Sequence, residues 1–160
     1  MAQDVETWEH KKKKAFFAGS NTGINHDDRG RGKSALGRLK LMQLSLENPE
    51  LLEVHFTKIH KLDEIDDLLP VHKHTTDKGK ELCEHLHHKY LISIDGWSSD
   101  NWRAPMILKS SSVPIVVESE HTPLYFDAWV PWTHYVPVKK DLSDLVENLM
   151  WLHNYDKKAK

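Results

Sequence analysis

The sequence predicts an α/β domain built as a doubly wound parallel sheet, with helices on both faces. Short apolar runs of strand length alternate with segments whose apolar residues recur at helical spacing. Two of the apolar runs lead directly into polar loops that contain glycine, where strand-to-helix connections are expected. Because a crossover between parallel strands is most simply made by a helix, this alternation favours a parallel sheet.

Apolar runs and helical spacing define the expected elements in chain order. The strands are expected at residues 15–17, 51–57, 90–94, 113–117 and 135–138. The helices are expected from Ser34 to the stop signal at Asn48-Pro49, and at residues 77–88, 101–108, 122–129 and 141–152. The charged stretch 61–76 is expected to be a loop or a broken helix.

The first and last of these helices have clear apolar faces. In the first helix the face comprises Ala35, Leu39, Met42 and Leu46. Asp141 is expected to cap the last helix, with Asp144 three residues after the cap. The apolar face of that helix comprises Leu142, Leu145, Val146, Leu149 and Leu152. Both helices should therefore pack on the sheet.

The composition suits one packed domain. The chain has 160 residues, of which 39% are hydrophobic and 29% charged, whereas a disordered chain would carry fewer large apolar residues. We expect a basic lead-in at 1–14, a single α/β domain at 15–156 and a short tail at 157–160. No apolar run approaches the roughly 20 residues of a membrane-spanning helix, and no signal peptide is recognisable.

Charge and cysteine content exclude several functional classes. The formal net charge of -2 argues against a general nucleic-acid-binding protein, which usually has a strong basic excess. Positive charge is concentrated between Lys11 and Lys40, so an anionic ligand, and a phosphate in particular, is expected near this segment. Cys83 is the single cysteine, which excludes an internal disulfide and a thiolate metal cluster.

The first glycine-containing loop follows the strand at 15–17. Gly19, Ser20 and Thr22 offer backbone N–H groups and hydroxyls just before a helix N-terminus, a setting that suits phosphate oxygens. Nearby cations that could complete such a site are Arg29, Arg31, Lys33 and Arg38. An ordinary surface loop explains this segment about equally well, because the spacing matches no fixed phosphate-binding motif.

The second loop follows the strand at 90–94 and repeats the design. It contains a glycine, an aromatic side chain, two hydroxyls and an arginine, at Gly96, Trp97, Ser98, Ser99 and Arg103. Arg103 could bind a phosphate with two parallel hydrogen bonds, and Trp97 could stack on a ring of the ligand. The alternative is a surface arginine that pairs with Asp95 or Asp100.

The histidines and the N-terminal lysines have simpler explanations. The chain has 12 histidines, and the pairs His72/His74 and His85/His88 suggest a His-rich metal-binding protein as an alternative function. Their spacing is poor for a metal, so solvated surface histidines are favoured. The run Lys11–Lys14 is interpreted as a solvated segment rather than a nucleic-acid patch, and His134 as a structural residue.

Four segments together resemble the family 90 glycosyltransferases. Residues 16–22 (FFAGSNT) are similar to the family's FFRGSxT, and 51–58 (LLEVHFTK) to its second strand. Residues 90–96 (YLISIDG), continuing to Arg103, resemble the family's KYLxNxDG segment. Residues 131–138 (PWTHYVPV) and 141–145 (DLSDL) match the most specific motif.

This resemblance, over about residues 16–155, implies the carboxy-terminal donor-binding lobe of a two-lobed GT-B enzyme. It assigns the diphosphate and ribose of UDP-glucose or UDP-xylose to Gly19, Ser20, Thr22, Arg38, Gly96 and Arg103. It implies an inverting transfer of the sugar to a hydroxyl of a protein or glycan, with arginines in place of a metal and no cofactor. The general base of the family lies in the other lobe, so no catalytic residue is assigned here.

Three questions stay open at this point. The chain could be an enzyme completed by an acceptor lobe, which a second chain could supply, or a noncatalytic module that binds a sugar nucleotide or a partner. The metal-binding alternative depends on the histidines alone. The compartment is also open, because the sequence as written is expected in the cytoplasm whereas the resemblance implies the secretory lumen.

Overall fold

The computed structural model describes residues 6–22, 36–59, 75–77, 81–96, 103–120 and 124–160. Its core is a five-stranded, all-parallel sheet in the order β2-β1-β3-β4-β5. The strands are β1 (Lys12–Ser20), β2 (Leu52–Lys58), β3 (His88–Ser93), β4 (Val113–Val117) and β5 (Val136–Val138). The predicted doubly wound, parallel α/β fold is confirmed, and its strand order 2-1-3-4-5 is one of the two common orders of such sheets.

Strands β1 and β3 bury side chains on both faces of the sheet, as a parallel sheet with two helical layers requires. On β1, Ala15 and Phe17 join the larger core cluster, while Phe16 and Ala18 join the smaller cluster on the opposite face. Every residue of β3 is buried. The runs of consecutive apolar residues in the sequence therefore identify the middle of the sheet.

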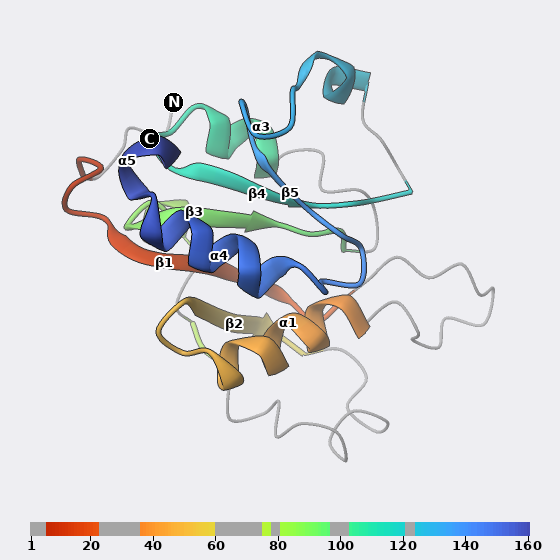
Figure 1. Ribbon diagram of the computed structural model, residues 1–160. Helices are drawn as coiled ribbons and strands as arrows, with labels where there is room; N and C mark the ends of the chain where they lie inside the picture. Colours follow the sequence, from red (N-terminus) through yellow and green to blue (C-terminus); the bar gives the residue numbers. More distant parts are fainter. Residues whose placement is uncertain (1–5, 23–35, 60–74, 78–80, 97–102, 121–123) are drawn as a thin grey trace.

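Helices cover the sheet as two layers (Figure 1). The larger core lies under α1 (Leu36–Glu47) and α4 (Leu145–Asn154), which supply Leu41, Met42 and Leu149 among others. The smaller core contains Leu86, just after α2 (Leu82–His85), and Ile107 of α3 (Arg103–Leu108). A short 3-10 helix, η2 (Leu124–Ala128), and the terminal α5 (Asp156–Ala159) complete the elements.

Strand order creates a switch point between β1 and β3. The chain moves from β1 outward to β2, then returns to place β3 on the other side of β1. Connections that leave the carboxyl ends of β1 and β3 therefore run to opposite faces, and ligands of doubly wound sheets bind in the crevice that results. The two predicted glycine-containing loops begin at these strand ends.

Several predicted elements differ from the structure. The helix expected at 77–88 is only α2 in the described residues, since β3 already begins at His88. The helix expected from Asp141 begins at Leu145, because Leu142 adopts a left-handed conformation (φ 59°) that ends any continuous helix there. Leu142 is still buried, whereas Leu46, expected on the buried face of α1, is 43% exposed.

Two further elements are shorter or longer than predicted. The aromatic segment at 122–129 forms the 3-10 helix η2 rather than an α-helix, in the part that the structure describes. β1 begins at Lys12, within the lysine run, because the backbone of this run pairs with the start of β3.

Most of the stretch 61–76 lies outside the described residues. Within the described segments, no helix has the length and apolar character needed to cross a bilayer.

Candidate functional site

Arg38 ties together the carboxyl ends of the two strands at the switch point. This side chain comes from α1 and is 6% exposed. Its Nη1 donates to the carbonyl oxygen of Ser20 (2.8 Å) and to Oγ1 of Thr22 (3.2 Å). Its Nη2 donates to the carbonyl oxygen of Ile94 (2.8 Å) at the end of β3. One guanidinium therefore fixes both strand ends and carries its positive charge between them.

Arg103 reaches the same place from the other face of the sheet. It opens α3, is 7% exposed, and its Nη1 donates to the carbonyl oxygen of Ala18 (3.1 Å). The guanidinium carbons of Arg38 and Arg103 lie 5.1 and 5.0 Å from the centre of the same ring, that of Phe17. Two like charges near one ring repel each other, so an anion that contacts both lowers the electrostatic energy.

Glycines allow the backbone to approach these guanidinium groups. A Cβ at Gly96 would lie 2.9 Å from Nη2 of Arg38 and 3.3 Å from Oγ1 of Thr22. A Cβ at Gly19 would lie 3.0 Å from Cζ of Phe17 and 3.5 Å from Nη2 of Arg103. A side chain at either position would crowd the neighbouring guanidinium group, so the absence of a side chain at both glycines leaves room for the two arginines.

Hydroxyl groups line the end of β1. The register between β1 and β2 shifts between Gly19 and Ser20, which marks the start of the loop. The hydroxyls of Ser20 and Thr22 are hydrogen-bonded to each other at 2.8 Å. Thr22 also accepts from Arg38, so these hydroxyls belong to one network with the guanidinium. Together they can offer donors to phosphate oxygens.

The structure therefore brings together six residues that the sequence singled out from distant segments. They are Gly19, Ser20, Thr22, Arg38, Gly96 and Arg103. The interpretation of Arg103 as a surface arginine is wrong, because its side chain is buried. Other candidates lie outside the described residues: Arg29, Arg31, Lys33, Trp97, Ser98 and Ser99. What the six residues bind remains a prediction.

Sequence reasoning did not identify the contacts of Phe17, and it named Asp95 only as a possible partner of Arg103. The alternation of β1 identifies Phe17 only as a core residue, and nothing local shows that two arginines would meet over its ring. Asp95 directly follows β3, and its Oδ2 accepts a hydrogen bond from Oγ of Ser119 beyond β4. The Asp-Gly pair after a buried strand was the only available signal.

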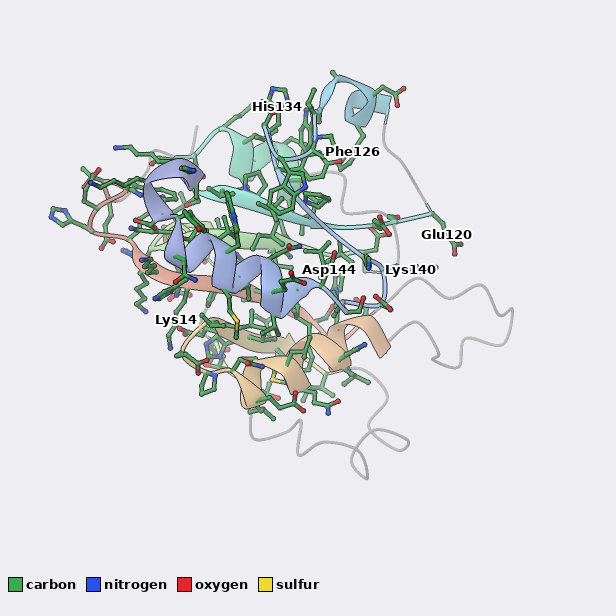
Figure 2. The ribbon with its side chains drawn as sticks, viewed as in Figure 1. Lys14, Glu120, Phe126, His134, Lys140 and Asp144 are labelled. Atoms are coloured by element: carbon green, nitrogen blue, oxygen red, sulfur yellow. The ribbon has the colours of Figure 1, made fainter. Side chains whose placement is uncertain are left out.

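Acidic residues follow β4 at the same edge of the sheet. The backbone N–H of Glu118 donates to the carbonyl oxygen of Val138 (2.8 Å), which continues the β4–β5 pairing. Glu120 forms an exposed ion pair with Lys140. Burial, and secondarily the negative charge of Glu118, raise the pKa of Tyr135. Figure 2 shows Glu120 and Lys140 at the edge where the strands end.

The histidine cluster is buried, which corrects the expectation of solvated side chains. His85 and His88 are 6% and 3% exposed. The imidazole of His88 stacks on Phe16 (4.3 Å, 15°), and its Nε2 lies 3.5 Å from Oε2 of Glu53. Burial lowers the pKa of His88, which favours the neutral ring. Within the described part of the chain, no three His, Cys, Asp or Glu side chains could jointly hold a metal.

Two further polar residues have structural contacts. Nδ1 of His134 accepts from the backbone N–H of Val130 (2.8 Å), which stabilises the turn before β5. Figure 2 shows His134 well away from Glu120 and the edge where the strands end. Lys11 is buried and donates to Oγ of Ser112 (2.8 Å), so it is not part of a solvated lysine run.

Comparison with known sequences places the site in a family context. The sequence profile of glycosyl transferase family 90 matches residues 1–160. Human "Protein O-glucosyltransferase 3" is 31% identical over 156 residues, covering 96% of this chain and 27% of the relative. "Protein O-glucosyltransferase 2" of Danio rerio is 29% identical over 154 residues, with the same two coverages of 96% and 27%.

A third relative gives a similar result. "Protein O-glucosyltransferase 1" of Rattus norvegicus is 30% identical over 149 residues, covering 93% of this chain and 34% of the relative. The chain thus spans between 27% and 34% of the length of these curated relatives.

Proposed function

Because this chain belongs to glycosyltransferase family 90, we propose that the carboxyl edge of its sheet binds the diphosphate of a UDP-sugar. The convergence of Arg38 and Arg103 on Phe17, from opposite faces of the sheet, is the observation that carries this proposal. Guanidinium groups form paired, charge-assisted hydrogen bonds with phosphate oxygens. The strand-end hydroxyls add neutral donors to the same edge.

The proposed chemistry follows from the charge of the leaving group. When the sugar leaves the donor, negative charge grows on the terminal phosphate of the nucleotide. Arginines held in place before the reaction stabilise that charge without reorganising, which lowers the barrier. Arg38 is held in this way by three acceptors on two strand ends. We propose that these cations take the place of a metal ion.

Glucose or xylose is the proposed sugar, transferred with inversion to a hydroxyl of a protein or glycan. The names of the relatives, which are protein O-glucosyltransferases, support glucose transfer to protein. We also propose that the acceptor-binding part and the general base lie in sequence outside this chain or in a second chain. The relatives, of which this chain spans 27% to 34%, leave room for such a part.

Calorimetric titration with UDP tests the donor site. Arg38→Ala and Arg103→Ala should each weaken binding about tenfold or more, because a buried charged hydrogen bond contributes about 1.5–3 kcal/mol. Lys157→Ala, which removes an exposed cation on α5, is the control and should leave the affinity unchanged.

Arg38 also bonds to the backbone, so folding must be measured together with affinity. Arg38→Lys keeps the charge but not the forked geometry. This variant should bind UDP more weakly than the unaltered chain, while its midpoint of thermal unfolding stays close to that of the unaltered chain. If folded variants at both arginines bind UDP as tightly as the unaltered chain, the proposed site is wrong.

Metal independence is tested by chelation. We expect UDP affinity and the midpoint of thermal unfolding to be the same with and without EDTA. Loss of a structural metal would lower the midpoint clearly, because metal-binding free energy contributes directly to folding. A large drop on chelation would restore the metal-binding alternative.

A noncatalytic donor-binding module is the second candidate, favoured by the limited share of the relatives that the chain spans. Incubation with UDP-glucose or UDP-xylose and acceptor peptides, followed by mass spectrometry, separates the candidates. The chain alone should bind donor but yield no glycosylated product. Repeated turnover by the chain alone would show that a general base lies within these residues.

A further inference from the structure

Phe17 lies where the two arginines of the proposed site meet, although it is a core residue. Its side chain is 0% exposed and belongs to the larger core cluster, near the end of β1. The guanidinium carbons of Arg38 and Arg103 lie over its ring, at 5.1 and 5.0 Å from the centre. At such distances a ring attracts a cation through the partial negative charge of its face. The core of the domain therefore contacts the site directly.

Each of these arginines is fixed at two points, the backbone of β1 and the aromatic ring. Nη1 of Arg103 donates to the carbonyl oxygen of Ala18 (3.1 Å). Nη1 of Arg38 donates to the carbonyl oxygen of Ser20 (2.8 Å). A hydrogen bond at one end leaves a long side chain free to pivot, whereas a second contact on the ring face also restricts the plane of the guanidinium group. The ring thus contributes to the orientation of both cations.

The ring itself is held by close packing. A Cβ at Gly19 would lie 3.0 Å from Cζ of Phe17 and 3.5 Å from Nη2 of Arg103. The ring is thus packed between the backbone of this glycine and the core, where side chains occupy defined rotamers. A leucine could fill the same apolar space, but it would present no negatively charged face to the guanidinium groups. The shape of the side chain and the charge of its ring face can therefore be separated by experiment.

We propose that Phe17 is a positioning residue of the donor site, whose ring holds Arg38 and Arg103 as the pair that binds one diphosphate. This inference rests on the proposed donor site. Phe17 does not touch the ligand in this proposal, and it acts through the two arginines. Weakening the attraction of the ring disturbs both cations at once, whereas a variant at either arginine removes only one of them.

Fluorination of the ring tests the proposal with little change to the shape of the core. Fluorine atoms withdraw negative charge from the ring face and so weaken its attraction for a cation. Phe17 is replaced by monofluoro-, trifluoro- and pentafluorophenylalanine through suppression of a stop codon, and UDP is titrated into each chain by calorimetry. UDP affinity should fall stepwise along the series and reach about a tenfold loss with the pentafluoro ring.

Phe56 is the matched control for this series. Its side chain is also 0% exposed, and the residue pairs in register with Gly19 on the neighbouring strand. Among the residues that the structure describes, no arginine or lysine lies over its ring. The same fluorinated series at Phe56 should leave UDP affinity unchanged. Thermal unfolding of both series checks that the fluorinated chains are folded.

A double-mutant cycle shows whether the ring acts through the arginines. In Arg103→Ala only one of the two described contacts with the ring remains, so the pentafluoro ring at residue 17 should cost less UDP affinity there than in the unaltered background. Phe17→Leu removes the ring face altogether and should weaken UDP binding at least as much as full fluorination. Phe56→Leu, in a folded chain, should not weaken it.

Three results would overturn the inference. The first is a UDP affinity that stays constant along the fluorinated series at Phe17. The second is an equal loss along the series at Phe56, which would assign the effect to packing. The third is a full effect of fluorination in Arg103→Ala. Failure of the unaltered chain to bind UDP, or UDP binding that depends on neither arginine, would instead overturn the donor site itself.

Discussion

The two ends of the sheet both contain buried cations beside an aromatic ring, but the contacts described for these cations join different parts of the fold. At the start of β3, Nζ of Lys89 lies 4.9 Å from the ring centre of Trp8 and 2.7 Å from Oδ2 of Asp156. At the opposite end, the described acceptors of Arg38 are two carbonyl oxygens and a hydroxyl. Among the contacts described, Lys89 thus pairs with a carboxylate of the chain, and Arg38 donates to neutral oxygens that belong to two strand ends.

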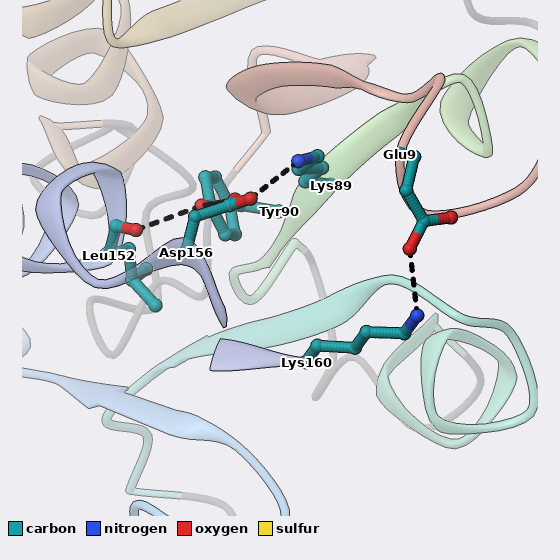
Figure 3. Close-up of polar contacts among 6 residues, drawn as sticks. All are labelled: Glu9, Lys89, Tyr90, Leu152, Asp156 and Lys160. Atoms are coloured by element: carbon teal, nitrogen blue, oxygen red, sulfur yellow. Dashed lines mark hydrogen bonds and ion pairs between the residues drawn. The ribbon is translucent and has the colours of Figure 1, made fainter. Parts of the chain in front are cut away.

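At the amino end of the sheet, Lys89, Tyr90 and Asp156 form a polar cluster, which we call the clamp. The hydroxyl of Tyr90 lies 3.0 Å from the carbonyl oxygen of Leu152 and 2.9 Å from Oδ1 of Asp156, which ties α4 and α5 to β3 (Figure 3). Burial and the adjacent carboxylate raise the pKa of Tyr90, so its hydroxyl stays a donor. In the contacts described, the buried cation at the amino end ties two helices to the sheet, whereas Arg38 at the carboxyl end ties two strand ends together.

The largest expected effect comes from breaking the clamp. Asp156→Asn leaves the buried Lys89 without its anion and should lower the free energy of unfolding by about 3 kcal/mol. This value is at the low end for a buried pair because Asp156 is 23% exposed. Urea titration measures the loss, and UDP affinity should not change. Lost UDP binding in a folded variant would mean that the two ends are not independent.

At the carboxyl end, the corresponding test adds one methyl group. Gly96→Ala places a Cβ 2.9 Å from Nη2 of Arg38, so the guanidinium must shift and UDP binding should weaken about tenfold. Gly37→Ala is the matched control, since its Cβ would lie 3.5 Å from Cδ1 of Ile94, an ordinary contact. The control should keep its affinity and gain up to about 1 kcal/mol of stability from helix propensity. Equal UDP affinity in both variants would contradict the steric role of Gly96.

Acid should lower the free energy of unfolding through the protonation of His88, at the amino end of the sheet. His88 begins β3, and its surroundings contain Glu53 and His55 on β2, Lys12 on β1 and His85 on α2. Because burial lowers the native pKa of His88, the unfolded chain binds more protons below the ordinary value of about 6.5. The contribution of neutral His88 to the free energy of unfolding should be fully present above about pH 6.5. It should decline as the pH falls toward the lower native pKa, by at most about 1.4 kcal/mol per pH unit.

Matched variants identify the group responsible. His88→Gln should flatten the decline of unfolding free energy between about pH 7 and pH 5.5, whereas His153→Gln, on the exposed side of α4, should not. If the free energy of unfolding of His88→Gln depended on pH as steeply as that of the unaltered chain, another group would be responsible for the proton uptake. Arginines stay protonated throughout this range, so the cationic pair at the other end keeps its charge.

The smallest effect is expected at an ion pair whose length resembles that of the clamp. Nζ of Lys160 lies 2.8 Å from Oε1 of Glu9, but both side chains are more than half exposed, at 58% and 63% (Figure 3). Water and dissolved ions screen this pair, so Lys160→Ala should leave the unfolding midpoint within experimental scatter. A shift as large as that of Asp156→Asn would show that length, rather than burial, decides the strength of these pairs.

Local patterns predicted much of the fold. Residues 113–117 form β4 at the predicted positions, and residues 51–57 nearly coincide with β2. These predictions succeed because a continuous or alternating apolar run depends only on residues within the strand itself. The helix expected at 77–88 is reduced to α2 in the described residues, and its last expected residue belongs to β3. There the hydrophilic residues His88 and Lys89 are buried, because an aromatic ring stacks on His88 and a carboxylate pairs with Lys89. Their tertiary partners come from other elements, which a local pattern does not contain.

The sequence by itself determined the class of the fold, the two strand-end loops and the glycines and arginines that belong to them. Only the tertiary structure decided that Arg38 and Arg103 share the ring of Phe17 and that Asp95 turns toward Ser119. Strand propensity and loop composition depend on neighbours in the chain. The meeting of the arginines depends on the strand order β2-β1-β3-β4-β5, which places the ends of β1 and β3 together through long-range pairing.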